Sequence, residues 1–459
     1  MAAATEASSA AFWPGGPIAE RRFMTFDGSH GGRSRLRRPD RYAAFHRGGG
    51  EEVVIARGAG LSYVAASFGA GTTAIDLTAF DRILGFDAGS LLVEVEAGAT
   101  LGALYDFLLP RGFYLPVQPG YRAITVGGCI GADVHGKNPA RDGTFLSQVE
   151  SLRLFHPDHG TIDLSATAEP ELFRATCGGL GLTGIILTAR LRVQALPSRL
   201  AEITLVPVAT ALEGAAVLRS AAAEAGGAHS WHDFSWFDRR FGRGHVRIFR
   251  FSDHPPEQND AAKPLRSTLS PERRAALPFC LLNSWTIRAI NFAYASSRPA
   301  DATTRLADLS EVLFPVHGNE LYFSLFGRAG FHESQVIIPH DAVADYLELI
   351  RAEARRRRVA VALGSAKLFA GKPDLLRFDG DGIGLAINVP RSARALPFLA
   401  ELDRFVAAAG GRPYLIKDSR LSRDVFEATY PESGQFRSIL KGWDPKRRFR
   451  SELARRLGL

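Results

Sequence analysis

The pattern of hydrophobic and polar positions divides the first part of the chain into short elements separated by glycine. Residues 53–56 form a continuous apolar run, which is typical of a buried strand, and residues 73–77 predict a second strand. Residues 91–96 alternate between apolar and polar side chains, so they predict a strand with one covered face. This part of the chain is therefore expected to be built from short strands joined by glycine-rich turns.

Helices and a hairpin are predicted further along the same region. Thr100 is placed to cap a helix over residues 101–109. Residues 149–155 and 161–164 predict a hairpin, and residues 170–176 predict a second helix. The region up to residue 196 is thus expected to mix strands with short helices.

The pattern changes after residue 197. Longer helices rich in Ala and Arg are predicted at residues 211–225 and 342–358, and aromatic strands at residues 246–251 and 321–326. This alternation predicts an α+β domain with an antiparallel sheet and helices on one face.

Length and charge narrow the class of protein. With 459 residues the chain is too long for one compact core, so we expect two domains. The formal net charge is +8 and the pI about 9.6, which raises the question of nucleic-acid binding. Arg is spread along the chain, and its densest run, residues 355–358, ends a predicted helix, where cations suit the helix dipole. We therefore expect no nucleic-acid partner.

Cysteine usage and the absence of targeting patterns favour a reducing compartment. Cys129, Cys177 and Cys280 have neither metal-ligand spacing nor a disulfide pattern, so no metal site is expected. The sequence has neither a secretory signal pattern at its start nor an apolar run long enough for a transmembrane helix. We expect a cytoplasmic protein, or one peripheral to the inner face of the membrane.

Two segments stand apart from the predicted elements. Residues 1–20 are rich in small residues and are expected to form a flexible tail. Residues 253–278 are polar, charged and rich in proline, which suggests a lid or a disordered excursion. An exposed lid here would provide a membrane contact.

Glycine-rich stretches carry the candidate chemistry of the first region. They lie at residues 57–63, 118–138 and 178–186. Glycine allows the backbone to approach a ligand closely, and successive N–H groups form a nest for a pyrophosphate. No Rossmann G-x-G-x-x-G fingerprint and no Walker A motif is present. The pattern therefore predicts a dinucleotide held between the loops of a small mixed domain.

Taken together and in order, several motifs resemble the vanillyl-alcohol-oxidase or PCMH-type FAD-binding superfamily. They are residues 56–63, 119–120, 125–128, 135–138 and 178–184. Within this superfamily the chain resembles the decaprenylphosphoryl-β-D-ribose 2′-oxidase family, because residues 367–369, 414–420 and 454–457 follow that family's order and spacing. The resemblance extends over nearly the whole chain from about residue 38.

The resemblance implies a two-domain α+β flavoprotein with a split FAD-binding domain. After the tail, residues 21–196 would form the FAD-binding domain and residues 197–412 the substrate-binding domain with its antiparallel sheet. Residues 413–459 would return to complete the FAD domain.

The resemblance also implies which residues contact the cofactor. The cofactor-binding set is Arg57, Gly58, Ala59, Gly60, Leu61, Ser62, Tyr63, Gly120, Thr125, Val126, Gly127, Gly128, Ala132, Asp133, Val134, His135, Gly184, Ile186, Tyr414 and Lys417. Residues 57–63 and 125–128 would hold the pyrophosphate. Leu61 lies where many superfamily members carry a His that tethers the flavin, so we expect FAD to be bound non-covalently.

Five polar residues are expected at the reacting end of the site. His135 is the candidate base for the hydroxyl proton, because its ordinary pKa lies near operating pH. Lys417 matches the family lysine that contacts both flavin and substrate. Lys137, Gln335 and Lys367 are the expected substrate-binding residues.

This sequence also departs from the family pattern. Ala386 stands at the family's inhibitor-reactive cysteine position, Gly384 at a neighbouring asparagine, Glu333 at a glutamine and Leu313 at a pocket tyrosine. In the first loop, Leu61 and Val64 replace an arginine and a glycine. FAD binding is expected to survive these changes, whereas the identity of the substrate depends on them.

The implied activity is FAD-dependent oxidation of a secondary sugar hydroxyl to a ketone. The family suggests 2′-oxidation of polyprenylphosphoryl-β-D-ribose, followed by a short-chain NAD(P)H reductase that completes an epimerisation to an arabinose donor. Quinone or oxygen would accept the electrons. The alternatives are a soluble sugar, polyol or aldonolactone oxidase that uses oxygen, and a flavin-binding partner subunit without turnover.

Overall fold

A computed structural model of the protein describes residues 19–45, 52–224, 232–234, 243–253, 277–298, 300–316 and 320–459. Most of the predicted tail at residues 1–20, and nearly all of the predicted excursion at residues 253–278, lie outside the described residues.

The first sheet joins two strand pairs of opposite type. Its order is β1(Ala19–Met24), β2(Gly31–Arg37), β4(Thr73–Asp76) and β3(Val54–Arg57). β1 and β2 are antiparallel, whereas β4 is parallel to both β2 and β3. The strands predicted at residues 53–56 and 73–77 are confirmed within one residue at each end. The first glycine-rich loop leaves the end of β3.

The second sheet is wholly antiparallel. Its order is β5(Ile83–Asp87), β6(Leu92–Glu96), β10(Ile185–Arg192), β8(Val149–His156) and β9(Gly160–Ser165). β8 and β9 form the predicted hairpin. The helix α4(Pro170–Thr176) has the predicted bounds, and a two-stranded sheet pairs β7(Phe113–Tyr114) with β11(Gln194–Ala195).

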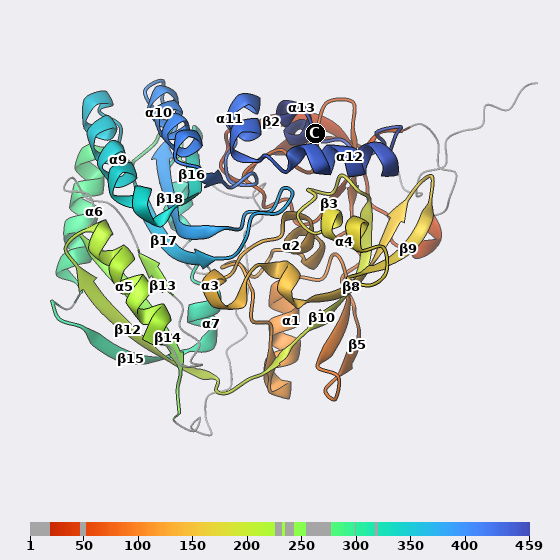
Figure 1. Ribbon diagram of the computed structural model, residues 1–459, viewed down its shortest axis with the longest axis horizontal. Coiled ribbons are helices and arrows are strands. Elements are labelled where there is room, and N and C mark those ends of the chain that lie inside the picture. The colour runs from red at the N-terminus through yellow and green to blue at the C-terminus, as the bar shows by residue number, and fades with distance from the viewer. Residues whose placement is uncertain are drawn as a thin grey trace, which may run out of the picture.

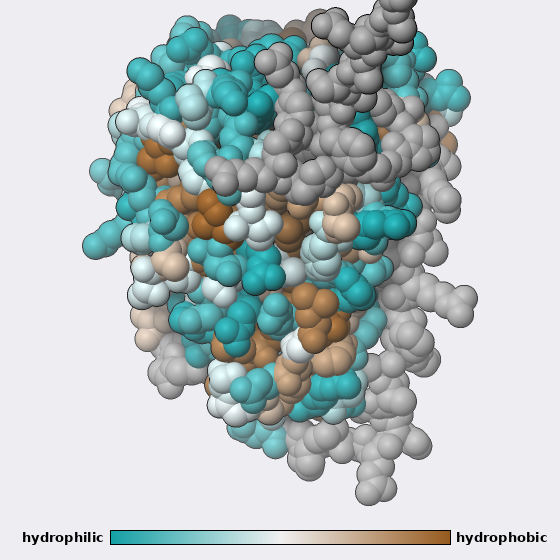
Figure 2. Space-filling view, turned by 90° about the vertical axis from the view of Figure 1, so that its right-hand side faces the viewer, coloured by the Kyte–Doolittle hydropathy of each residue, from teal (hydrophilic) through white to brown (hydrophobic). Residues whose placement is uncertain are grey.

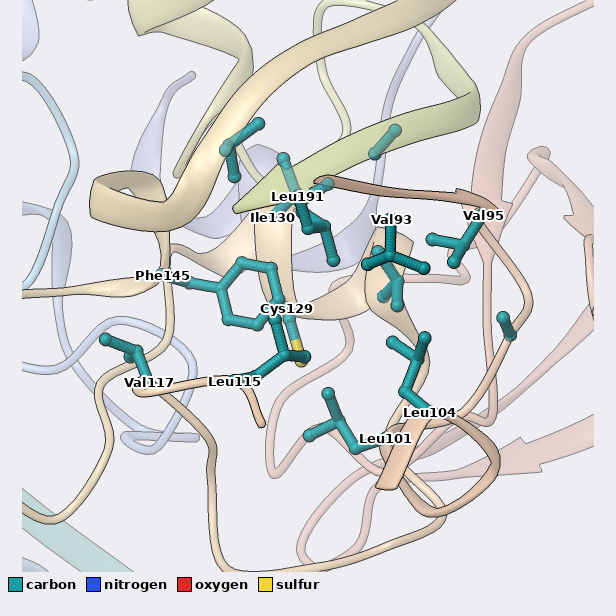
Figure 3. Packing of buried hydrophobic residues seen from close by; sticks show 14 of the residues in the cluster. Val93, Val95, Leu101, Leu104, Leu115, Val117, Cys129, Ile130, Phe145 and Leu191 are labelled. Carbon is teal, nitrogen blue, oxygen red and sulfur yellow. The ribbon is translucent and has the colours of Figure 1, made fainter. Parts of the chain in front are cut away.

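A hydrophobic core fills the space between the second sheet and two helices (Figure 3). Thr100 caps α1(Leu101–Leu108) as predicted, because its hydroxyl accepts a hydrogen bond from Ala103 N. The second helix, α2(Val126–Ala132), contributes Cys129 and Ile130 to this core. The apolar side chains of each helix thus lie on one face, and that face packs into this core. The packing fixes the position of α2 within the glycine-rich stretch at residues 118–138.

The middle of the chain forms two antiparallel four-stranded sheets, at the left of Figure 1. The first has the order β13(His232–Phe234), β14(Gly244–Phe251), β12(Leu200–Val208) and β15(Thr303–Asp308). The second has the order β17(Leu363–Ala370), β18(Asp381–Pro390), β16(Phe331–Ile338) and β19(Arg412–Pro413). The predicted antiparallel pairing in this region is confirmed.

Helices cover the outer side of these two sheets (Figure 1). The long helices α5(Ala211–Glu224) and α9(Val343–Arg357) confirm the predicted Ala- and Arg-rich helices, and α10(Ala395–Ala408) packs beside α9. Their apolar faces share one core with β16 and β18. Shorter or more peripheral helices are α3(Pro139–Asp142), α6(Ser284–Ser296) and α7(Leu309–Leu313).

The strand predicted at residues 321–326 is wrong. Residues Leu321–Ser324 form the short helix α8 instead. Tyr322 and Phe326, four positions apart, bring their ring centroids within 5.3 Å of each other, and Phe326 also contacts Phe331 on β16. The aromatic side chains of this segment thus pack against one another at helical spacing and against a neighbouring strand. They do not alternate between two faces as they would in a strand.

The C-terminal helices pack against the beginning of the chain. α11(Arg423–Thr429), α12(Ser433–Trp443) and α13(Glu452–Leu457) lie beside β2 and β3 in Figure 1. They share a core with Ile55 and Val64, and Leu453 N donates to Ala65 O. The end of the chain therefore closes over the region of the first glycine-rich loop.

The described structure is mixed α+β. On the side of the molecule shown in Figure 2, the described surface is mostly hydrophilic, with hydrophobic residues in separate small patches. Among the described helices, none combines the length and the apolar character needed to cross a membrane.

Candidate active site

A cavity of about 490 Å³ lies between the glycine-rich region and the sheet of β16, β18 and β17. This volume is within the range of small-molecule and cofactor sites. The loop after β3, the exposed face of α2 and the stretch around Gly181 form one wall. Side chains of the three strands and of the turn that contains Lys417 form the other.

The loop after β3 presents its backbone to the cavity. Within the described residues, the N–H groups of residues 58–62 donate no hydrogen bond to another part of the protein. Gly60 has φ +70°, and a Cβ there would lie 2.0 Å from Arg57 Nη2. A Cβ on Gly58 would lie 2.1 Å from Thr125 Oγ1. The close packing needs glycine, and the free N–H groups form a nest suited to an anion.

The second segment expected at the pyrophosphate uses its N–H groups differently. Thr125 caps α2 by accepting from Gly128 N, while Val126 N and Gly127 N donate to Ala99 O and Ala97 O. These three donors are therefore already bonded within the protein. What α2 offers the cavity is a face of small residues, since its larger side chains point into the core.

Asp133 ends α2 and shapes the loop that follows it. Its backbone is left-handed, with φ 41°, and its carboxylate accepts a hydrogen bond from Leu146 N. Burial raises the pKa of this carboxyl to about 6, against the lowering effect of Arg377. The side chain is fully buried and turned away from the cavity lining.

The register of three strands builds the charged wall. Glu333 on β16 lies opposite Asn388 on β18, and Gln335 lies opposite Ala386. On the other side of β18, Ser365 of β17 lies opposite Ala386. Because side chains alternate along a strand, all five of these residues project from one face of the sheet.

Small residues on the central strand keep this wall open. Ala386 lines the cavity between Gln335 and Ser365. At Gly384, opposite Lys367, a Cβ would lie 2.4 Å from a ring carbon of Phe369. The position of the Phe369 ring therefore requires glycine at residue 384. Lys367 reaches the cavity beside this glycine.

His135 is buried and held at both ring nitrogens. Gln335 Nε2 lies 2.8 Å from His135 Nε2, and His135 Nδ1 lies 3.0 Å from the Gly136 carbonyl oxygen. A neutral ring that donates from Nδ1 and accepts at Nε2 satisfies both contacts, and Lys367 Nζ lies 3.5 Å from the same Nδ1. Burial lowers the pKa of His135 well below its usual value, and the charges of Lys367, Lys417 and Lys137 lower it further.

Lys417 lies on a turn anchored to β16. Tyr414 N donates to Gln335 O, and Lys417 N donates to Tyr414 O. Lys417 Nζ is 3.4 Å from Glu333 Oε1 and 3.5 Å from the centroid of the Tyr63 ring. The ammonium thus has a carboxylate on one side and an aromatic face on the other.

The structure brings nearly all the predicted site residues together. All five polar residues expected at the reacting end line the cavity. Of the predicted cofactor residues, only Val126, which packs in the core, and Asp133 do not line it. Leu313, the position of a replaced pocket tyrosine, also lies in the core and not at the cavity.

Four further residues line the cavity: Glu333, Asn388, Ser365 and Phe26. Glu333 is expected from the sequence only as a departure from the family pattern that bears on the identity of the substrate, and no site role is predicted for the other three. The spacing of Glu333 and Gln335, two positions apart on a strand, is a signal that they share a face. Asn388 and Ser365 depend on strand register, and Phe26 on the turn between β1 and β2, which the local sequence does not reveal.

Comparison with known proteins identifies the cofactor and the family. The sequence matches the FAD binding domain family over residues 49–165, which contain the first loop and α2. It is 33% identical over 425 residues to a decaprenylphosphoryl-β-D-ribose oxidase of Mycolicibacterium smegmatis, covering 89% of this chain and 90% of the relative. The chain belongs to the decaprenylphosphoryl-β-D-ribose oxidase family. An uncharacterised protein of Streptomyces coelicolor is 34% identical over 78% of this chain and all of its own length.

The protein described by this structure is therefore an FAD-dependent oxidoreductase that acts on CH–OH groups, and it oxidises a sugar. The residues around the cavity fit FAD: the first loop offers free N–H groups and α2 a face of small residues. More distant similarity, 36% identity over 26% of the chain, links it to an L-galactono-1,4-lactone dehydrogenase of Oryza sativa, of which only 20% is covered.

Proposed function

We propose that the protein oxidises the 2′-hydroxyl of polyprenylphosphoryl-β-D-ribose to a ketone, as the first half of an epimerisation to an arabinose donor. This proposal rests on the similarity, along almost the whole chain, to a decaprenylphosphoryl-β-D-ribose oxidase. Three lysines on the cavity lining, Lys137, Lys367 and Lys417, support a substrate that bears a phosphate. Bound FAD supplies the two-electron oxidant.

We propose that the first loop binds the pyrophosphate of FAD, with residues 58–62 as backbone donors. The N–H groups of residues 126–128 are bonded within the protein, so their contribution would be the close approach that Gly127 and Gly128 allow. Gly120, Ala132, Val134, Gly184, Ile186 and Tyr414 would line the rest of the cofactor site. No His stands in the first loop, which supports a dissociable FAD.

His135 and Lys417 are the proposed residues of the reacting end, and Lys137, Gln335 and Lys367 the proposed substrate contacts. A cation such as Lys417 stabilises negative charge that develops on a reduced cofactor or on a substrate oxygen. Gln335 holds His135 in one orientation through their hydrogen bond. Burial, reinforced by the charges of the three lysines, lowers the pKa of His135 and keeps the imidazole neutral, so it presents a hydrogen-bonding group without adding another charge.

We propose a split FAD domain of residues 21–196 and 413–459 around a substrate domain of residues 197–412. The core shared by the C-terminal helices and the first loop region supports the split. The boundary near residue 412 coincides with β19, which pairs with β16 and leads into the turn of Lys417.

We infer that the cellular partners are a short-chain NAD(P)H reductase, a quinone or oxygen as electron acceptor, and a membrane surface that holds the lipid-linked substrate. Support for membrane contact comes from α6, where Trp285 and Phe292 are each 76% exposed and Arg288 lies beside the Trp285 ring. Exposed aromatic and cationic side chains are typical of the membrane interface. Binding to vesicles of anionic lipid, lost in a W285S/F292S variant, is the expected result.

The alternative is a soluble sugar, polyol or aldonolactone oxidase that passes electrons to oxygen. The partial similarity to lactone dehydrogenases and to L-gulonolactone oxidase supports it weakly, because each match covers about a quarter of the chain. The carboxylate of Glu333 in the cavity is compatible with an uncharged substrate rich in hydroxyl groups.

Anaerobic titration of the purified holoenzyme tests the proposal. The flavin bands are expected to bleach on addition of a short-chain polyprenylphosphoryl-β-D-ribose and not on addition of free sugars, polyols or aldonolactones. Acid precipitation is expected to release FAD into the supernatant. Bleaching by the uncharged compounds alone would replace the proposal by the oxidase alternative.

A further inference from the structure

Glu333 is a buried carboxylate in the proposed site. It is the only Asp or Glu among the described residues that line the cavity. Its side chain is 9% exposed, so the charge is taken out of bulk water and must be compensated within the site. A charged group kept in such a place needs an explanation in the chemistry of the cavity.

The neighbours of Glu333 hold it in a defined position. Asn388 Nδ2 donates to Glu333 Oε2 at 2.8 Å, and Tyr322 OH donates to Asn388 Oδ1 at 3.2 Å. The other oxygen, Oε1, lies 3.4 Å from Lys417 Nζ. A carboxylate has about four acceptor positions on its two oxygens, so these contacts leave it able to accept a further hydrogen bond.

His135, in contrast, has little capacity left to accept a proton. In its neutral form the lone pair at Nε2 accepts from Gln335, and Nδ1–H donates to Gly136 O. Burial and three nearby lysines lower the pKa of the imidazole well below its usual value, which makes it a weak base.

We propose that the Glu333 carboxylate accepts the proton of the substrate hydroxyl that is oxidised, with Lys417 as its counter-ion. This inference rests on the proposed oxidation of an alcohol. The O–H proton passes to Glu333, while the carbinol carbon loses its hydrogen with the bonding electron pair to oxidised FAD. The substrate becomes a ketone and FAD is reduced, so atoms and electrons balance.

The decisive variants are Glu333→Gln, which keeps the shape and the hydrogen bond acceptor of the side chain, and Glu333→Asp, which keeps the carboxylate. Glu348→Gln, which removes an exposed carboxylate on α9 that pairs with Arg351, is the matched control. Removing a proton-accepting group costs about 10²- to 10⁴-fold in rate. Glu333→Gln is expected to slow anaerobic flavin reduction at least about 100-fold, Glu333→Asp to restore part of the rate, and the control to match wild type.

A second readout is independent of turnover. In oxidised Glu333→Gln holoenzyme, ribose 5-phosphate or inorganic phosphate is expected to bind about tenfold more tightly than in wild type, because Lys417 loses its counter-ion. Binding is followed by the perturbation of the flavin spectrum, and FAD affinity is expected to stay unchanged.

Flavin reduction in Glu333→Gln within threefold of wild type would overturn the proton-acceptor role. Equally slow reduction in Glu333→Asp and Glu333→Gln would overturn it as well, since position and not the carboxylate would then matter. Unchanged phosphate affinity would overturn the counter-ion role. Failure of wild type to be reduced by any sugar alcohol would overturn the proposed function itself, while the phosphate measurement would still test the ion pair.

Discussion

The two walls of the cavity are built from different parts of the polypeptide. On one wall, residues 58–62 and the face of α2 offer backbone N–H groups and small residues. On the other, β16, β17 and β18 offer side chains, among them Glu333, Gln335 and Lys367. The first wall offers a ligand the close backbone approach that glycine permits, and the second offers it charge and hydrogen-bonding side chains.

This difference parallels the extent of the match to the FAD binding domain family. The match to the FAD binding domain family covers residues 49–165 and so includes the first loop and α2, but neither the stretch around Gly181 nor any of the three strands. A wall made of backbone is recognised by its glycine pattern, whereas a wall of side chains changes its chemistry with single substitutions. The proposed FAD contacts therefore lie mainly on the first wall, and the proposed substrate contacts mainly on the second.

The largest expected effect comes from adding a side chain to the backbone wall. Gly58→Val places its Cβ against Thr125, which caps α2, so the loop must move away from the helix. Overpacking of this kind costs about 1–3 kcal/mol, or about 10- to 100-fold in affinity, and the bulk of valine puts the effect at the upper end. We expect FAD affinity, measured by flavin fluorescence, to fall about 100-fold.

Gly85→Ala on β5 is the control for the loss of a glycine, because no heavy atom lies within 4 Å of the added Cβ. It is expected to bind FAD as wild type does. Equal FAD affinity in Gly58→Val and wild type would show that the loop does not pack against the cofactor site as described.

The backbone wall was largely predictable from sequence, with one exception. Glycines that follow a short strand predict the first loop, and every predicted residue of that loop lines the cavity. The helix α2 was not predicted, because three glycines in seven residues disfavour a helix on local propensity. Its cap at Thr125 and the burial of Cys129 and Ile130 in the core outweigh that cost.

The side-chain wall was predictable only in part. The family resemblance pointed to Gln335, Lys367 and Lys417, which the structure brings to one cavity. The bond between Glu333 and Asn388 joins residues 55 positions apart, and it exists because β16 and β18 pair in one register. Strand register over such distances is set by the packing of the whole sheet and not by the local pattern.

The next prediction tests the charge of the second wall. Lys367→Met removes a cation from the cavity while keeping most of the side-chain volume. Hydrogen bonds to charged groups contribute about 1.5–3 kcal/mol, so inorganic phosphate and ribose 5-phosphate are expected to bind about 10- to 100-fold more weakly. FAD affinity is expected to change little, since the proposed pyrophosphate donors lie on the opposite wall.

Lys372→Met, at an exposed position just after β17, is the matched control and is expected to leave phosphate binding unchanged. An equal loss of affinity for phosphate in both variants would show a general effect of net charge. A loss of FAD affinity in Lys367→Met alone would show that the two walls do not divide their ligands in this way.

The smallest expected effect concerns the opposite face of β16. His332 alternates with Glu333, is buried, and its Nδ1 has no hydrogen-bond partner within the described structure. Burial, together with the charges of Arg420 and Arg391, lowers the pKa of His332 from 6.5 to about 4. In the unfolded chain the ring takes up a proton near pH 6.5, whereas in the folded protein it stays neutral until about pH 4.

Stability therefore falls as pH decreases through this window, because the unfolded state binds the additional proton. Between pH 7 and 5.5 His332 is expected to remove about 1 kcal/mol from the free energy of unfolding. Other buried groups titrate in the same range, including Asp133 with a pKa near 6, whose effect has the opposite sign.

The comparison of His332→Asn with wild type isolates the contribution of the histidine. The variant is expected to lose less stability than wild type between pH 7 and 5.5, as measured by urea denaturation. If the free energy of unfolding depended on pH equally in His332→Asn and wild type, water would reach the His332 ring. On β16, only the side chains that face the cavity would then be shielded from bulk water.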